Sequence, residues 1–251
     1  MKNWCLPILL SLFSATVQAQ ENNKMHTDWP DQSEDVHVMK PGELQLETGF
    51  SLTRFRTDDA TAAVAHELIR YGLTKRVELR LVVEDGKLRD RYIEETSQSV
   101  APLAASVKYA LVDDHKWLPD IALVGYLKLP FTSRSREQKA YWSPAFVAAF
   151  EHKLTEKLML EYNFGIRQKA YSSDYGWLST TGLMYDITDK LEVFAEHFAQ
   201  YQSAEEPQHN FDAGILYDLT DNLQLDLAAG STIKYDEPNR FLSIGVCYRM
   251  Q

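Results

Sequence analysis

A two-residue alternation of apolar and polar side chains runs through the chain from Pro41 to its last residues. In segment 158–167, every second residue is large and apolar, and from Glu161 onward the residues between them are polar or small. This period is typical of a β-strand with one apolar face, and helical spacing does not fit it. The clearest examples are segments 43–52, 158–167, 211–219 and 223–229.

The alternation recurs in about twelve segments, an even number. The noisier ones are 62–73, 77–85, 101–111, 120–129, 144–154, 176–187, 190–201 and 240–250. No segment beyond the N-terminus approaches the ~18 consecutive apolar residues of a helical span. The pattern therefore predicts an all-β fold, a transmembrane antiparallel up-and-down β-barrel of about 12 strands over residues 41–251.

The N-terminus has the three parts of a bacterial export signal. Lys2 is basic, an apolar run extends from Trp4 to Phe13, and Val17-Gln18-Ala19 fits a signal-peptidase site. This order predicts a signal peptide over residues 1–19 that is removed on export. Its removal takes Lys2 and Cys5 away, so the net charge changes from −10 to −11 and Cys247 is the only cysteine left. Without an intrachain disulfide, a closed sheet in a membrane is a suitable source of stability, because every backbone group is paired around the ring.

One short turn recurs between the predicted strands. Each copy has an apolar residue, a threonine, two polar residues and another apolar residue, in Leu73–Val77, Leu154–Leu158, Ile187–Leu191 and Leu219–Leu223. Threonine, aspartate and asparagine favour tight turns through hydrogen bonds from side chain to backbone. The other connections are longer or more charged, so the sequence predicts short periplasmic turns, long outer loops and both chain ends on the periplasmic side.

Residues 20–40 separate the signal peptide from the first predicted strand. They are rich in Asp, Glu, Gln and His and lack periodic apolar residues. We interpret them as an irregular periplasmic leader, or as a plug that enters the barrel. The sequence leaves these two alternatives open.

The polar face of the predicted strands carries both carboxylates and cations. Charges that faced lipid would cost about 2–4 kcal/mol each near the midplane, so these residues are expected to line the lumen. They either pair across strands as structural ladders or line an aqueous path that selects solutes. The lumen-lining candidates are Glu47, Arg70, Glu78, Arg80, Lys108, Glu161, Arg167, Asp186, Glu192, Asp212 and Arg249.

Several motifs resemble one known family. They are Trp29-Pro30-Asp31-Gln32-Ser33-Glu34, the run from Lys40 to Phe50, Leu68-Ile69-Arg70-Tyr71-Gly72-Leu73-Thr74, and Val77-Glu78-Leu79-Arg80. The stretch from about Asp28 to the C-terminus resembles the outer-membrane transporters labelled for the meta pathway of phenol degradation. The resemblance implies an outer-membrane barrel with a transport role and brings no catalytic residues. The phenol label carries over only weakly.

The expected partners follow from the same pattern. The last strand alternates Leu242, Ile244, Val246, Tyr248 and Met250 with small or polar residues, and it resembles the signal recognised by the barrel-insertion machinery. This places the protein in the cell outer membrane, in contact with outer-membrane lipid. The acidic balance argues against nucleic acid. The solute and the oligomeric state stay open.

Enzymatic and metal-binding motifs are weak. The chain has no G-x-S-x-G, and no histidine lies beside a nucleophile motif, so we expect no enzyme activity and no cofactor. His26 and His37 stand among acidic residues of the leader, but their spacing matches no metal-ligand motif, so we expect no metal.

Three functions fit these observations. The favoured hypothesis is a channel for small solutes, including aromatic or hydrophobic compounds, that diffuse passively through a narrow charged lumen. The second is a closed structural or adhesive barrel that acts through its outer loops. The third is a soluble periplasmic barrel that holds a ligand, with apolar residues pointing inward and charges outward.

Overall fold

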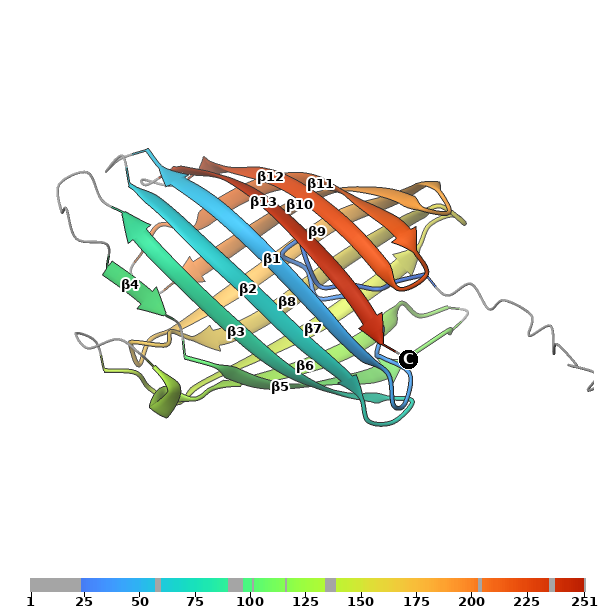
Figure 1. The fold of residues 1–251 in the computed structure, drawn as a ribbon, viewed down its shortest axis with the longest axis horizontal. Coiled ribbons are helices and arrows are strands. Elements are labelled where there is room, and N and C mark those ends of the chain that lie inside the picture. Colours follow the sequence, from blue (N-terminus) through green and yellow to red (C-terminus); the bar gives the residue numbers. More distant parts are fainter. Residues whose placement is uncertain are drawn as a thin grey trace, which may run out of the picture.

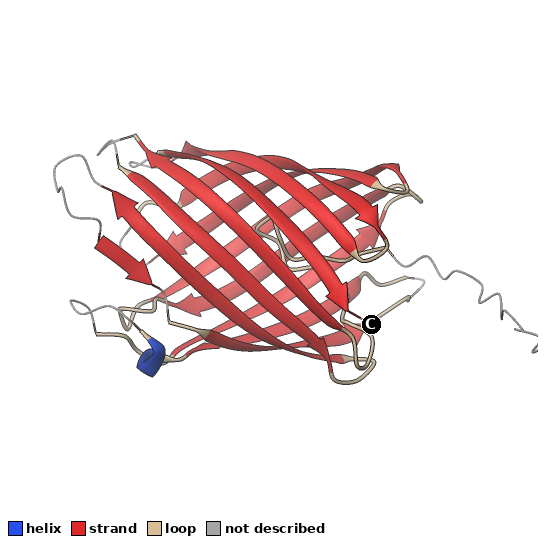
Figure 2. Ribbon diagram, in the orientation of Figure 1, coloured by secondary structure: helices blue, strands red, loops and turns tan. Residues whose placement is uncertain are grey.

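The protein folds as a cylinder built almost entirely of strands (Figure 2). The computed structural model describes residues 24–56, 60–89, 97–100, 102–115, 117–133, 139–202, 205–234 and 238–250, so the predicted signal peptide lies outside the described residues. The strands are β1 (Leu44–Phe55), β2 (Thr61–Gly72), β3 (Val77–Arg89), β4 (Ser97–Val100), β5 (Ala104–Val112), β6 (Asp120–Lys128), β7 (Ser143–Lys153), β8 (Leu158–Gln168), β9 (Tyr175–Thr188), β10 (Leu191–Gln202), β11 (Gln208–Thr220), β12 (Leu223–Lys234) and β13 (Asn239–Met250). A short 3₁₀ helix, η1 (Pro130–Thr132), follows β6. Among the residues described, no helix has both the length and the apolar character needed to cross a membrane.

Twelve of these strands close into a ring of antiparallel neighbours (Figure 1). The first and last strands pair over their full length, from Leu44 opposite Met250 to Phe55 opposite Asn239. Strand β3 pairs with β2 on one side and with β5 on the other. The short β4 pairs only with the outer part of β3, so it extends the wall without entering the ring. The predicted fold is confirmed.

The ring is polar inside and apolar outside. Arg70 and Lys108 are fully buried on the face of the sheet that lines the lumen, whereas Phe164 is 58% exposed on the opposite face. Strand β13 shows the same alternation of a buried inner face and an exposed outer face: Cys247 is buried, and its neighbours Val246 and Tyr248 are exposed. This arrangement is the reverse of the one that a soluble, ligand-holding barrel requires.

The two ends of the cylinder differ as the sequence predicts. The short turns and the C-terminus lie at one end of the cylinder, called the inner end below, and η1 and β4 lie at the other, the outer end (Figure 1). In the short turns, the threonine hydroxyl accepts hydrogen bonds from backbone amides. Thr188 Oγ1 accepts them from Lys190 N at 3.2 Å and Leu191 N at 3.1 Å. Thr74 and Thr155 repeat the same pair of bonds.

Some strands extend beyond the predicted bounds at the outer end. Strand β12 continues to Lys234, although its alternation weakens after Ala229. The reason is local: Gly230, Ser231 and Thr232 are small, so neither face shows a clear apolar pattern there. Backbone pairing with β11 nevertheless continues to Lys234, opposite His209.

Candidate functional site in the barrel lumen

The leader lies inside the ring. Figure 1 shows it within the half of the barrel that carries the short turns. Lys24 contacts Asp186 and Glu192 near the inner end, and the chain then rises to an apex at residues 29–34. It returns through Val36, which packs on Ala122 and Ala149, to Met39 beside Glu78. The leader thus forms a hairpin that enters and leaves through the inner end.

The eleven predicted lumen residues all occupy inward-facing positions of their strands. Five of them, Glu47, Arg70, Glu78, Arg80 and Lys108, gather around Asp28 of the leader. Glu161 and Asp212 are buried on the opposite wall. The remaining ones are Asp186 and Glu192, which bind Lys24, Arg249, which donates to the Asp221 carbonyl, and Arg167, which faces an outer cavity.

The Asp28 cluster, defined as Asp28 with these five side chains, joins the leader to β1, β2, β3 and β5. An Asp28 carboxylate oxygen lies 2.9 Å from Arg80 Nη2 and 3.2 Å from Arg70 Nη1, and the other lies 2.9 Å from Lys108 Nζ. Burial by itself raises the pKa of Asp28, but the cations of Arg70, Arg80 and Lys108 outweigh burial and hold that pKa well below its usual range. The carboxylate is therefore charged and compensated in the docked leader.

Wall side chains also satisfy the backbone of the leader. Glu47 accepts hydrogen bonds from the amides of Asp28 and Trp29, at 3.0 and 3.1 Å. Glu196 accepts one from Gln32 N at 2.8 Å, and Glu78 accepts one from Met39 N at 2.8 Å. An irregular segment can be buried only when its backbone polar groups find such partners. The polar face of the wall supplies them.

Two glycines leave room for the leader at its apex. Gly49 and Gly245 face each other across β1 and β13. A Cβ on Gly245 would meet the Trp29 indole nitrogen at 2.6 Å, and one on Gly49 would collide with the same ring. The indole can lie against the wall only because both positions lack a side chain.

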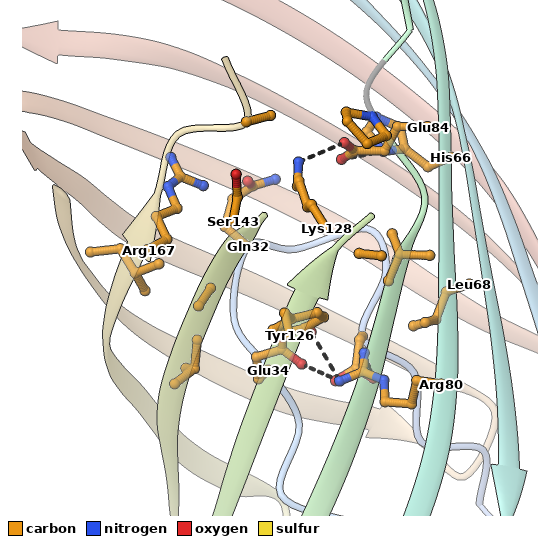
Figure 3. Close-up of a pocket in the computed structure, with 18 of the residues that line it drawn as sticks. Gln32, Glu34, His66, Leu68, Arg80, Glu84, Tyr126, Lys128, Ser143 and Arg167 are labelled. Atoms are coloured by element: carbon orange, nitrogen blue, oxygen red, sulfur yellow. Dashed lines mark hydrogen bonds and ion pairs between the residues drawn. The ribbon is translucent and has the colours of Figure 1, made fainter. Parts of the chain in front are cut away.

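The leader divides the lumen into unequal parts. On its outer side, a cavity of about 450 Å³ is lined by Trp29, Gln32 and Glu34 of the leader and by wall residues that include Lys128 and Arg167. Figure 3 shows the labelled residues of this cavity. A second outer cavity of about 390 Å³ lies beside the apex. On the side of the leader that faces the inner end of the cylinder, two cavities of about 10 and 30 Å³ have room for about one or two water molecules.

The outer cavity mixes apolar and charged groups. Leu68, Val82 and Leu178 contribute apolar surface. Lys128 lies 3.4 Å from Glu84, whereas the Arg167 guanidinium donates a hydrogen bond to the neutral Gln200 amide oxygen, at 2.5 Å. Figure 3 shows Arg167 and Lys128 on opposite sides of Ser143 and Gln32.

Sequence reasoning missed several partners of the leader. Asn163 accepts a hydrogen bond from Glu34 N at 2.5 Å, Thr180 contacts Ser33 at 2.6 Å, and Tyr126 donates to Glu34. These residues are uncharged, so a search for charges on the polar face overlooks them. Their position on the inward-facing register was the available signal.

The family model described as "Putative MetA-pathway of phenol degradation" matches residues 27–250. The chain belongs to this family. The resemblance read from the leader and the first three strands is thereby confirmed. Among curated proteins, no sequence matches the chain.

Solved structures share the fold of this family member at low sequence identity. An outer-membrane channel from Pseudomonas putida F1 is 15% identical, with a TM-score of 0.68, over 86% of this chain and 98% of that one. The KdgM porin, in complex with disordered oligogalacturonate, is 12% identical, with a TM-score of 0.59, over 82% and 99%. The CymD monoaromatic hydrocarbon channel is 7% identical, with a TM-score of 0.51, over 85% and 89%. The fold is thus that of outer-membrane barrels, and these neighbours are named as channels and porins.

Proposed function

We propose that the protein is an outer-membrane channel for small organic solutes whose lumen is held closed by the docked leader. The observation that carries this proposal is the division of the lumen. Among the residues that the structure describes, cavities of about 450 and 390 Å³ lie on the outer side of the leader, and cavities of about 10 and 30 Å³ lie on its inner side. Polar anchors, and not a continuous apolar core, hold the leader in place. A segment held this way can be displaced while the ring of backbone hydrogen bonds stays intact.

The experiment is electrical recording of the purified barrel in planar bilayers. The double variant D28A/E34A removes the two leader carboxylates that pair with Arg70, Arg80 and Lys108 of the wall, so we expect its open probability to rise about tenfold or more over the native barrel. The matched control D174A/E205A removes two carboxylates from exposed outer loops and should behave as the native protein. Faster gel migration of unboiled samples shows that each variant is folded.

A closed structural barrel is the second candidate, because the inner cavities leave so little space. The same recording separates the two. If folded D28A/E34A stays as silent as the native barrel under all voltages, the channel proposal is wrong and the closed barrel is favoured.

We propose that the outer cavity receives aromatic or amphipathic solutes first. Its apolar side chains and the rings of Trp29 and Tyr126 suit a small aromatic body, and Arg167 suits an anionic group. One structural neighbour is named for monoaromatic hydrocarbons, which fits the apolar part of this lining. In liposomes that carry D28A/E34A, added Arg167→Gln should slow benzoate entry several-fold and leave benzyl alcohol entry unchanged. Equal slowing of both solutes, or of neither, would remove Arg167 from this role.

A further inference from the structure

Six ionisable side chains, three from the leader and three from the wall, meet where the leader contacts β6, β7 and β8. Glu151 of β7 and Glu161 of β8 are register partners that face inward directly opposite each other. Asp35, His26 and His37 approach them from the leader. In each of three overlapping sets, one ligand atom per residue lies within 4.8 Å of the others: His26 with Asp35 and His37, Asp35 with Glu151 and Glu161, and His37 with Asp120 and Glu151.

The carboxylates in this group are close and buried, and the His37 imidazole is their partner on the leader. Like charges directly opposite on neighbouring strands are destabilising, and Asp35 adds a third carboxylate to the pair. Lys108 Nζ approaches the Asp35 backbone oxygen, but its charge pairs with Asp28. Lys153 lies 3.9 Å from Asp120 and its side chain is largely exposed.

Two buried oxygens in the group have no hydrogen-bond partner among the residues that the structure describes. They are Asp35 Oδ2 and Glu151 Oε1, and both residues are more than nine-tenths buried. A buried, unpaired carboxylate oxygen is costly unless an ion or a donor satisfies it. Both oxygens belong to residues of the same set, so one ion between the leader and the wall has both carboxylates within reach.

The imidazoles add nitrogen donors. His37 Nδ1 lies 2.7 Å from Asp35 Oδ1 and 3.9 Å from Glu151 Oε2. The rings of His26 and His37 are stacked, with centroids 3.7 Å apart. The inner cavity of about 30 Å³ is lined by His26, Asp35, Glu151 and Glu161, so it offers space for a single ion.

We propose that Asp35, His37 and Glu151, with His26 and Glu161 beside them, form a binding site for one divalent transition-metal ion that fastens the leader to β7 and β8. Mixed imidazole and carboxylate ligands suit Zn²⁺ and related ions, whereas Ca²⁺ and Mg²⁺ prefer oxygen alone. The ion compensates the opposed glutamates and joins both arms of the leader to the wall. This site does not depend on whether the barrel conducts.

Calorimetric titration of the purified, chelator-treated barrel with Zn²⁺ tests the site. We expect one Zn²⁺ per barrel, with excess Mg²⁺ or Ca²⁺ unable to displace it. Glu151→Gln and His37→Asn should each weaken Zn²⁺ affinity by about tenfold or more. The matched control is Glu196→Gln, because Glu196 is also a buried wall glutamate that holds the leader, through Gln32 and Ser33, but it lies outside the group. Its Zn²⁺ affinity should equal that of the native barrel.

A second readout identifies the ligands. Co²⁺ bound at this site should give visible absorption bands that shift in His37→Asn and stay unchanged in Glu196→Gln. The outward-facing pair His197 and His209, whose ring nitrogens lie 3.2 Å apart, is the competing location. The proposal is wrong if the native barrel binds no Zn²⁺, if Mg²⁺ displaces it, or if binding survives Glu151→Gln and is lost in His209→Asn.

Discussion

At the scale of single residues, Asp28 compensates three buried cations at once. The substitution Asp28→Ala leaves Arg70, Arg80 and Lys108 facing one another in a buried site. Breaking a buried ion pair by removing one partner costs about 3–5 kcal/mol. We expect hydrogen exchange of the leader amides, such as Trp29 N and Gln32 N, to accelerate by about a hundredfold or more. Unchanged exchange would show that the backbone bonds alone hold the leader.

Replacing the carboxylate of Asp31, three residues later, should strengthen docking of the leader at neutral pH, whereas replacing that of Asp28 weakens it. Burial and the nearby carboxylates of Glu196, Glu161 and Asp212 raise the pKa of Asp31 well above 3.8. Because the docked state holds the proton more tightly than the free leader does, docking weakens as pH rises above about 3.8 toward the raised pKa. Asp31→Asn should therefore slow leader exchange at neutral pH and have no effect below pH 3.8. Faster exchange of the leader amides in Asp31→Asn at neutral pH would contradict the predicted direction of this pH dependence.

The paired glycines under Trp29 make a steric prediction. Gly49→Val places a side chain where the indole lies, so the apex must move away from β1 and β13. We expect the exchange protection of Trp29 N and Gln32 N to be lost while the barrel stays folded on unboiled gels. Gly125→Val is the control, because a Cβ at Gly125 meets nothing within 4 Å. Equal behaviour of the two variants would mean that Trp29 does not need this space.

At the scale of elements, the threonine turns are repeated units with the same hydrogen bonds. Thr188→Ala removes the acceptor for Lys190 N and Leu191 N, at a cost of about 1 kcal/mol in the free energy of unfolding. Thr74→Ala acts in a turn that shares no strand with the first, so the double variant should lose about 2 kcal/mol. Urea unfolding in detergent micelles measures this loss. Thr188→Ser keeps the hydroxyl and should be near native, whereas a loss equal to that of Thr188→Ala would exclude the hydroxyl as the cause.

Strands and turns were predictable from the sequence because their signals are local. Alternation assigns each residue to a face, so the inward positions of Arg70, Glu78 and Arg80 followed from their own strands. The partners of the leader did not follow, because Asp28 meets residues 42 to 80 positions away and Lys24 meets Glu192, 168 positions away. The lumen wall carries many carboxylates and cations, and alternation cannot choose among them. The wall charges that contact the leader come together only when the ring closes.

At the scale of the whole molecule, the two surfaces of one sheet have opposite solvent preferences. The outer surface carries large apolar residues such as Phe50, Ile215 and Ile244, whereas the inner surface carries the charges that anchor the leader. Because backbone pairing closes the ring, the wall needs no continuous apolar interior and can offer much of its inner face to polar contacts. Wall side chains consequently hold the leader, through its side chains and its backbone amides, on a cylinder that is closed without it. Any opening of the lumen is then a motion of the leader relative to a fixed wall.

A reversible covalent lock tests that motion. Ser33 Oγ at the apex lies 2.6 Å from Thr180 Oγ1 of β9, which is close enough for a disulfide between cysteines at these positions. In the D28A/E34A background, oxidised S33C/T180C should show the low conductance of the native barrel, and reduction should restore the open state. Each single-cysteine variant serves as a control, and Cys247 is buried, so it does not compete for pairing. If the oxidised barrel conducts as well as the reduced one, solutes pass beside a stationary leader, and the outer cavity is part of a permanent path.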